Sequence, residues 1–209
     1  MAPARRRPRA YHHGDLRTVV LEEVRDIIRE QGVTVVSIRE VARRARVSHA
    51  APSHHFGNKA GLLTAFAIQG YDLLADTVKA DIAAAGATTP ADVLAIMGQA
   101  YVRFALENPE HFGVMFPGEL VNQHDPEYVR ATNRCYRPLM DVVTRGSAEG
   151  MLSADTDLVA TSAWSLVHGL ASLWLSGRIQ ERTGATDAPA LARAVTELFV
   201  DRMLRRKPL

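Results

Sequence analysis

Serine and histidine side chains are concentrated in one short segment of the chain. Ser48, His49, Ser53, His54 and His55 lie within eight residues, and no acidic residue stands among them. Hydroxyl and imidazole groups on an exposed helix face can donate hydrogen bonds to phosphates or to base edges, and no carboxylate is present to repel a polyanion. The segment therefore predicts a surface that contacts nucleic acid.

Two short helices are expected to position these side chains. Ser37 followed by Glu40 matches a capping box, in which the serine caps helical N–H groups and the glutamate side chain reaches back, so a helix should run to about Ala45. After a tight turn, Ser48 is predicted to cap a second helix that ends near Phe56. The apolar residues expected to join the two helices are Ile38, Val41, Ala42, Val47 and Phe56. This is a helix-turn-helix pattern.

Charge is divided unevenly along the chain. Residues 1–60 hold 12 Lys and Arg against 6 Asp and Glu, a balance of +6, whereas the remainder holds 13 against 17, a balance of −4. Residues 1–10 carry four arginines and two prolines, and they are predicted to form a disordered basic arm. This distribution indicates a polyanionic partner for the N-terminal part, while a merely solubilising tail is the equal alternative for the arm.

Several motifs between residues 11 and 66 together form a recognisable set. They are Tyr11-His12-His13-Gly14-Asp15-Leu16, Ser37-Ile38-Arg39-Glu40-Val41-Ala42, Val47-Ser48, His55-Phe56 and Asn58-Lys59. With them, this quarter of the chain resembles the DNA-binding domain of the tetracycline-repressor (TetR) family. The remainder resembles the family in its helical plan, and Val167-His168-Gly169 is similar to a Trp-His-Gly signature of one branch.

The resemblance implies DNA-binding roles on both short helices. The serines near helix starts and the lysine would bind phosphates, residues 49–51 would face the major groove, and the paired histidines would meet base edges or backbone. The full predicted DNA-binding set is Ser37, Arg39, Ser48, His49, Ala50, Ala51, Ser53, His54, His55 and Lys59. Two departures stand out: Ser53 replaces a usual tyrosine, and Pro52 removes an N–H, which predicts a second helix that begins late.

Beyond residue 57 nearly every segment of the chain is predicted to be helical. Gly32 ends the first helix, Asn58 starts a long connecting helix over 58–85, and further helices are expected over 89–107, 109–116, 126–146, 156–176 and 188–205. Their start signals are Thr89-Pro90, Asn108-Pro109, Asp125-Pro126 and, more loosely, Asp187. No alternating strand pattern is present. The predicted fold is all-α, with a three-helix helix-turn-helix domain at 11–57 and a dimerising helical bundle at 58–209.

Aromatic and sulfur-containing residues of the second half could line a pocket for a small, mostly apolar effector, with plain core as the equal alternative. The predicted pocket residues are Tyr101, Phe104, Phe112, Met115, Phe116, Tyr136, Met140, Trp164, His168 and Trp174. For His168 the favoured interpretation is a hydrogen-bonded core histidine, and a ligand-binding group is the alternative.

Residues 158–177 contain no Asp, Glu, Lys or Arg and are long enough to cross a bilayer. Several serines and small residues favour a buried dimer-interface helix over a membrane span. The histidines lack the spacing of a metal site, Cys135 is the single cysteine, and no catalytic motif is present, so no metal, cofactor or enzymatic activity is predicted. With no secretory signal, the sequence indicates a cytoplasmic homodimer that binds a double-stranded DNA operator and an unidentified small effector and is not membrane-bound. A membrane-tethered DNA binder and a helical enzyme are the alternatives.

Overall fold

A computed structural model describes residues 13–152 and 154–204 of the chain, so the predicted arm at 1–10 lies outside the described residues. The elements in order are α1 (His13–Gln31), the 3-10 helix η1 (Val33–Val35), α2 (Ile38–Ala45), α3 (Ala50–Phe56), α4 (Lys59–Ala85), α5 (Pro90–Glu107), α6 (Pro109–Met115), α7 (Pro126–Ala148), α8 (Thr156–Leu175), α9 (Arg178–Thr183) and α10 (Ala188–Met203). The described residues contain no strand beyond one isolated bridge between Leu152 and Leu204. The predicted all-α fold is confirmed.

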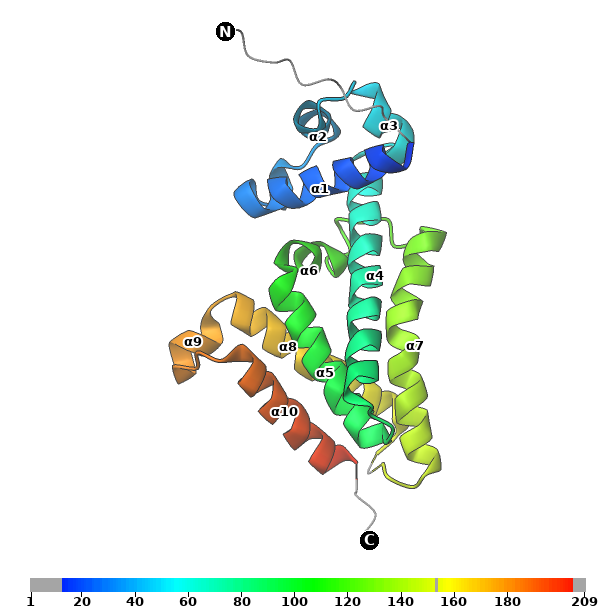
Figure 1. Ribbon diagram of the computed structural model, residues 1–209, viewed down its shortest axis with the longest axis vertical. Helices are drawn as coiled ribbons and strands as arrows, with labels where there is room; N and C mark the ends of the chain where they lie inside the picture. Colours follow the sequence, from blue (N-terminus) through cyan, green and yellow to red (C-terminus); the bar gives the residue numbers. More distant parts are fainter. Residues whose placement is uncertain (1–12, 153, 205–209) are drawn as a thin grey trace.

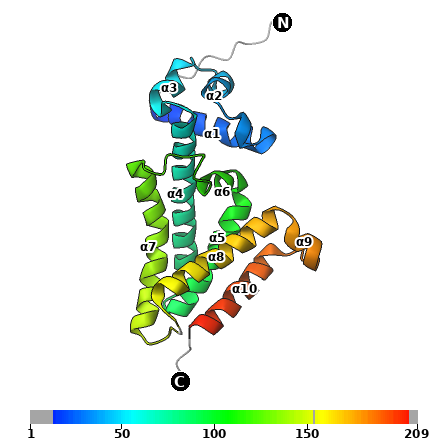
Figure 2. The same cartoon turned by 180° about the vertical axis from the view of Figure 1, so that it is seen from behind.

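The helices form two groups joined by α4. In Figure 1, α1, α2 and α3 lie together at the top of the molecule, and α4 runs downward from them through the lower bundle. The α7 helix lies along one side of α4, while α5, α8 and α10 lie on the other side and α6 sits just below α1. Figure 2 gives the same arrangement from behind, with α8 crossing in front of α4 and α5. The long helix is thus shared by the small upper group and the bundle.

Side-chain caps define most helix starts, as the sequence predicts. Ser37 accepts a hydrogen bond from the backbone N–H of Glu40, and Asn58 accepts one from that of Gly61. The predicted caps before prolines also form, because the side chains of Thr89 and Asp125 accept N–H groups from the first turns of α5 and α7. These bonds satisfy backbone donors that have no partner inside the helix. Asp187 and Gly32 likewise begin α10 and end α1.

Three predicted capping interactions are wrong. Glu40 does not reach back to Ser37, because its carboxylate bonds to two arginines instead. Ser48 does not cap α3, which starts at Ala50, so that Pro52 falls within the first turn, where a missing N–H costs no helical hydrogen bond. The Asn108 side chain makes no cap for α6, since its amide donates to the carbonyl of the preceding helix end instead.

One continuous apolar core links the upper group to the bundle. Val20 and Val24 of α1, Val41 of α2 and Phe66 of α4 are fully buried in it, and the cluster continues through α5 and α6. A second cluster closes the lower end of the bundle, where α5 packs against α8 and α10. The α5 helix approaches closely there because Gly98 has no side chain, and a Cβ at that position would stand 2.7 Å from Thr196.

Candidate nucleic-acid interface and ligand cavity

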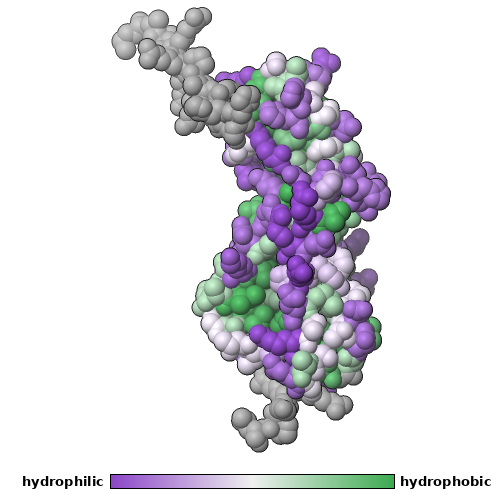
Figure 3. Space-filling view, turned by 90° about the vertical axis from the view of Figure 1, so that its right-hand side faces the viewer, coloured by the Kyte–Doolittle hydropathy of each residue, from purple (hydrophilic) through white to green (hydrophobic). Residues whose placement is uncertain are grey.

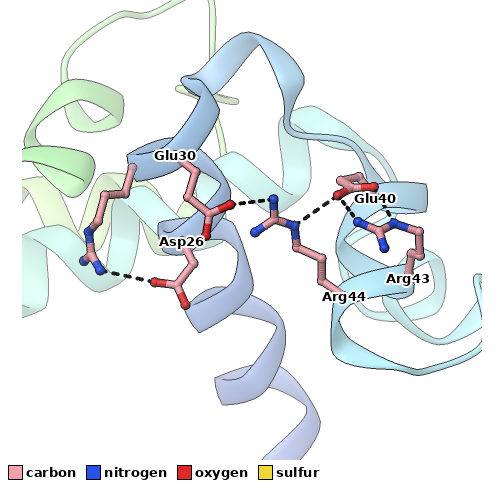
Figure 4. A network of polar contacts seen from close by, with 6 residues as sticks. Asp26, Glu30, Glu40, Arg43 and Arg44 are labelled. Atoms are coloured by element: carbon pink, nitrogen blue, oxygen red, sulfur yellow. Dashed lines mark hydrogen bonds and ion pairs between the residues drawn. The ribbon is translucent and has the colours of Figure 1, made fainter.

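Ion pairs hold α2 against α1, as Figure 4 shows. Arg44 bridges Glu30 of α1 at 2.8 Å and Glu40 of α2 at 3.0 Å, and Arg43 also pairs with Glu40 at 2.7 Å. Hydrogen bonds from the two guanidinium groups lower the pKa of Glu40 to about 2. Both arginines are therefore engaged within the protein, and the orientation of α2 is fixed by charge as well as by its buried Val41 and Ala42.

The α3 helix buries one face and exposes the other. Pro52 and Phe56 are buried against the upper core, whereas His49, His54 and His55 are exposed. The imidazole rings of the last two meet edge to face with centroids 5.9 Å apart. The sequence thus places two buried residues four positions apart on α3, leaving imidazole donors on the outer surface.

The other predicted DNA-binding residues lie on α2 or α3, at helix starts or, for Ser48, in the turn between α2 and α3. Ser48, Ala50 and Arg39 are exposed, while Ala51 is half-buried. The hydroxyl of Ser53 donates to the backbone carbonyl of His49. The structure also brings Ser37 to the start of α2 and Lys59 to the start of α4, where the lysine ammonium donates to the carbonyl of Thr34 at 2.9 Å.

A cavity of about 930 Å³ lies in the bundle, between α4, α5, α7, α8 and α10. Leu74, Val78 and Ile82 line it from α4, so the helix that begins beside α3 also forms a cavity wall. The predicted pocket residues that line this cavity are Tyr101, Met115, Phe116, Tyr136 and Trp164. Figure 3, which faces α7, shows green apolar surface on this lower half beside a purple polar strip.

The other five predicted pocket residues stand outside the cavity lining. They are Phe104, Phe112, Met140, His168 and Trp174. Phe104 is fully buried, because its position on α5 points into the core that joins bundle and upper group. His168 is held by Tyr101, whose hydroxyl lies 2.9 Å from its Nδ1, and it packs between the rings of Phe112 and Phe116. Burial lowers the pKa of His168, which favours the neutral imidazole in this apolar setting.

Two further hydroxyls at the cavity, on Tyr71 and Tyr128, were not among the predicted pocket residues. Both donate to the backbone carbonyl of Met115 at 2.9 Å, and they lie 3.5 Å from each other. Cys135 also lines the cavity, with its Sγ 3.0 Å from the carbonyl of Tyr71, and burial raises the pKa of its thiol to about 12. The helical spacing of Tyr71 with Leu74 and Val78, which also line the cavity, was the sequence signal that could have found it.

Polar side chains connect the upper group to the bundle where α1 meets α6. Arg29 of α1 donates from its Nε to Glu110 of α6 at 2.7 Å, and the Glu110 side chain is 9% exposed. Next to it, His111 stacks on Phe66 with ring centroids 4.0 Å apart and lies 3.1 Å from Gln69. Burial lowers the pKa of His111 to about 4, and the neighbouring Arg25 acts in the same direction. This junction joins the α3-bearing group to the cavity-bearing bundle.

Exposed apolar side chains gather on α8 and α10. Leu158 and Leu173 of α8 are 59% and 50% exposed, and Leu198 of α10 is 60% exposed. Within the described residues, α8 is the one helix long and apolar enough to span a membrane, and a third of its apolar window is buried. Residues 13–152 and 154–204 contain no group of three His, Cys, Asp or Glu side chains placed to hold a metal ion.

Comparisons with known proteins agree with this arrangement. Residues 20–66 match the family described as bacterial regulatory proteins, tetR family, and residues 94–199 match the tetracyclin repressor-like, C-terminal domain. No curated protein sequence matches the chain. A protein of unknown function from Rhodococcus sp. RHA1 is 28% identical over 95% of this chain and 100% of its own, with a TM-score of 0.81.

Two solved regulators share the fold at lower identity. The TetR family regulator PfmR from Thermus thermophilus is 22% identical over 90% of this chain and 99% of its own, with a TM-score of 0.67. The transcriptional regulator FadR from Bacillus subtilis, solved in complex with stearoyl-CoA, is 17% identical over 88% of this chain and 97% of its own, with a TM-score of 0.69. The family models, the all-α fold and the outward face of α3 lead to one conclusion: the chain belongs to the TetR family of DNA-binding transcription regulators.

Proposed function

We propose that this protein is a homodimeric repressor that leaves a palindromic operator when a small, mostly apolar effector enters the bundle cavity. One observation carries the proposal: α4 is a single 27-residue helix that begins directly after α3 and then forms a wall of the 930 Å³ cavity. A ligand that changes the tilt of α4 would move the α3 helices of a dimer to a spacing that no longer fits DNA. Release requires only that the ligand prefer that second conformation, and a coupling of about 1–3 kcal/mol would suffice.

The DNA-reading surface in this proposal is the exposed face of α3 with the starts of α2 and α4. Footprinting on the DNA upstream of the coding region should show a two-fold symmetric site, with half-sites about one helical turn, ~34 Å, or a multiple of it apart. The double substitution of His54 and His55 by Ala should weaken specific binding, since loss of a base contact costs about 1–3 kcal/mol. Because both side chains are exposed, the melting temperature should stay unchanged. Protection of a single half-site by a monomer would contradict the proposal.

The dimer interface is proposed to cover the exposed apolar faces of α8 and α10. Burying Leu158, Leu173 and Leu198 removes apolar surface from water, which favours association over exposure as a monomer. Leu173→Glu should shift the protein toward monomers in sedimentation, whereas the matched control Leu73→Glu, on α4, should leave the dimer intact. Recovery of the full chain in the membrane fraction would instead favour the tethered alternative.

The effector is proposed to carry a long apolar portion. The cavity lies within the size range of ligand pockets, and its lining combines apolar helix faces with a few hydroxyls such as those of Tyr71 and Tyr128. The FadR structure of the same fold holds stearoyl-CoA, which makes fatty acyl compounds the first candidates to test. Calorimetry and gel shift with one candidate should give a lower ligand affinity for the DNA-bound protein, because coupling between the two sites is reciprocal. Equal affinity would rule out that compound as an inducer.

The junction between α1 and α6 is proposed to transmit the ligand's effect together with α4. Arg29 and Glu110 tie the DNA-reading group to the helix that ends at the cavity residue Met115. Arg29→Ala should therefore leave operator binding by the free protein intact but reduce the factor by which ligand lowers it. An unchanged ligand response in this variant would assign transmission to α4 alone. We also propose that the protein acts in the cytoplasm, that residues 1–10 track DNA, and that the chain belongs to the branch with the Trp-His-Gly motif. Regulators of this family are generally not enzymes.

A further inference from the structure

Arg46, in the turn between α2 and α3, holds a backbone conformation that favours glycine. Its φ and ψ are 56° and 39°, and it is the single non-glycine residue with positive φ among the described residues. The turn imposes this geometry, because the N–H of Arg46 bonds to carbonyls of the last turn of α2 and that of Val47 bonds to Ala42. A side chain at such a position destabilises the fold relative to glycine, so the turn alone does not account for an arginine there.

The Arg46 guanidinium has no hydrogen-bond or ion-pair partner among the described residues, and its residue is exposed. The two arginines near the end of α2 behave differently. Arg43 and Arg44 are engaged by Glu40, and Arg44 also by Glu30. Arg46 is therefore an exposed cation in a strained backbone conformation, and it has no ion-pair partner among the described residues, unlike Arg43 three residues before it.

The position of Arg46 places this cation beside the recognition surface. Ser48 and His49 follow it directly, and the connection between α2 and α3 runs across the top of the molecule in Figure 1, at the end remote from α5–α10. The exposed histidines of α3 belong to that same end. Arg46 itself precedes α3, so its side chain flanks the recognition helix and does not lie within the face that would enter a groove.

We infer that Arg46 is a DNA-phosphate contact that flanks α3, an inference that rests on the proposed DNA-binding function. An exposed guanidinium outside the recognition helix matches phosphate, which it can bind with two parallel hydrogen bonds at any sequence. A strained backbone conformation lowers stability, and its presence at a binding position is explained when the side chain at that position contributes to binding. Phosphate contact also predicts a signature that a base contact lacks, namely an equal loss on every DNA sequence.

The test uses the full-length protein with Arg46→Gly and Arg46→Asn, since both residues accept positive φ and neither carries charge. Arg46→Gly should raise the melting temperature by about 2–4 °C through relief of the backbone strain. Both variants should bind a retarded fragment of the upstream DNA about tenfold more weakly. The slope of log affinity against log salt should fall by about two, because a dimer loses two phosphate contacts.

Two controls separate charge, geometry and place. Arg46→Lys retains the cation and the strain, so its affinity should stay within about threefold and its salt slope should be unchanged. Arg43→Gln removes an equal charge from α2, and because Arg43 is already paired with Glu40 it should leave the slope unchanged. If the salt slope fell as much in Arg43→Gln as in Arg46→Asn, the effect would reflect the net charge of the protein and not a contact at Arg46, and the inference would be overturned.

The remaining outcomes distinguish failure of the Arg46 phosphate contact from failure of the proposed DNA-binding function. If wild-type protein retards neither the upstream fragment nor a scrambled duplex of the same length, the proposed function fails first. If wild type binds and Arg46→Asn binds with unchanged affinity and slope, DNA binding stands and the phosphate contact is refuted. Equal weakening on both duplexes supports the phosphate contact, whereas weakening confined to the upstream fragment would overturn it in favour of sequence readout.

Discussion

The upper helices α1–α3 and the bundle of α4–α10 are stabilised in different ways. In the upper group, fully buried valines such as Val24 and Val41 form a solid core, and the ion pair between Arg44 and Glu30 joins α2 to α1. In the bundle, the helices border a cavity of about 930 Å³, and its walls lack packing partners on one side. A tightly packed group transmits motion as a unit, whereas walls around a void can move when it fills. The upper group is thus the rigid part of the molecule, and the bundle is its deformable part.

The largest expected effect comes from the residue that joins the two regions. Phe66→Ala removes a fully buried ring that stacks on His111, and it should destabilise the protein by about 3–5 kcal/mol.

Both tryptophans, Trp164 and Trp174, lie on α8, so fluorescence reports on the bundle while circular dichroism reports on all helices. Because one core links the regions, the two signals should give the same urea midpoint in wild type. Separate midpoints would mean that the regions unfold independently.

The sequence predicted the framework of both regions because helix starts depend on local chemistry. Asn58, Thr89 and Asp125 cap helices at the expected positions, since a side-chain acceptor needs only the next turn of its own chain. Where a side chain has competing partners, local patterns failed. The Glu40 carboxylate bonds to two arginines and not to its own helix start, and the Asn108 amide donates to a carbonyl at the end of α5.

The cavity could be predicted only in part. Phe104 and Tyr101 are aromatic residues of the same helix, yet the first is core and the second lines the cavity. Which role an apolar side chain takes depends on whether the opposite helix fills the space, and that is decided by tertiary packing. The short helix α9 was likewise missed, because six mostly polar residues between two glycines carry no apolar period.

The junction should make stability depend on pH. Burial lowers the pKa of His111 to about 4 from its ordinary value of 6.5. The unfolded chain therefore takes up a proton at this residue in a range where the folded protein does not, so stability falls as pH decreases from 6.5 toward 4. Each pH unit inside this window lowers the free energy of unfolding by about 1.4 kcal/mol, which gives a loss of roughly 2–3 kcal/mol between pH 6.5 and 4.5.

Urea unfolding of wild type and His111→Gln at several pH values measures this loss. In the variant, the free energy of unfolding should no longer show the His111-dependent decrease between pH 6.5 and 4.5. Glu40 does not interfere, because its pKa is lowered to about 2 and its contribution is lost only as pH falls below its ordinary value of 4.5. Equal slopes in the two proteins would show that His111 is protonated equally easily in the folded and unfolded states.

A matched pair on α8 tests whether the bundle is hollow. Ala160 and Ala163 lie one turn apart and are both buried, but Ala163 lines the cavity and Ala160 does not. Ala160→Leu should overpack the core and destabilise the protein by about 1–3 kcal/mol. Ala163→Leu has space to occupy, so its free energy of unfolding should stay within about 0.5 kcal/mol of wild type while effector affinity falls. Equal destabilisation by both would contradict the cavity.

The smallest expected effect concerns the charges that fix α2, where two neighbouring arginines share one partner. Arg43 is 68% exposed and pairs with Glu40 inside its own helix, so water and salt screen the pair and Arg43→Ala should lower the melting temperature by less than about 1 °C. Arg44 is 16% exposed and joins α2 to Glu30 of α1, and its buried stem adds packing, so Arg44→Ala should lower it by about 2–4 °C. Glu40→Gln separates charge from capping, because Ser37 accepts from the backbone N–H of residue 40 and that bond survives the change. If Arg44→Ala were no worse than Arg43→Ala, the rigidity of the upper group would rest on its valine core alone, and the contrast with the bundle would be one of packing and not of charge.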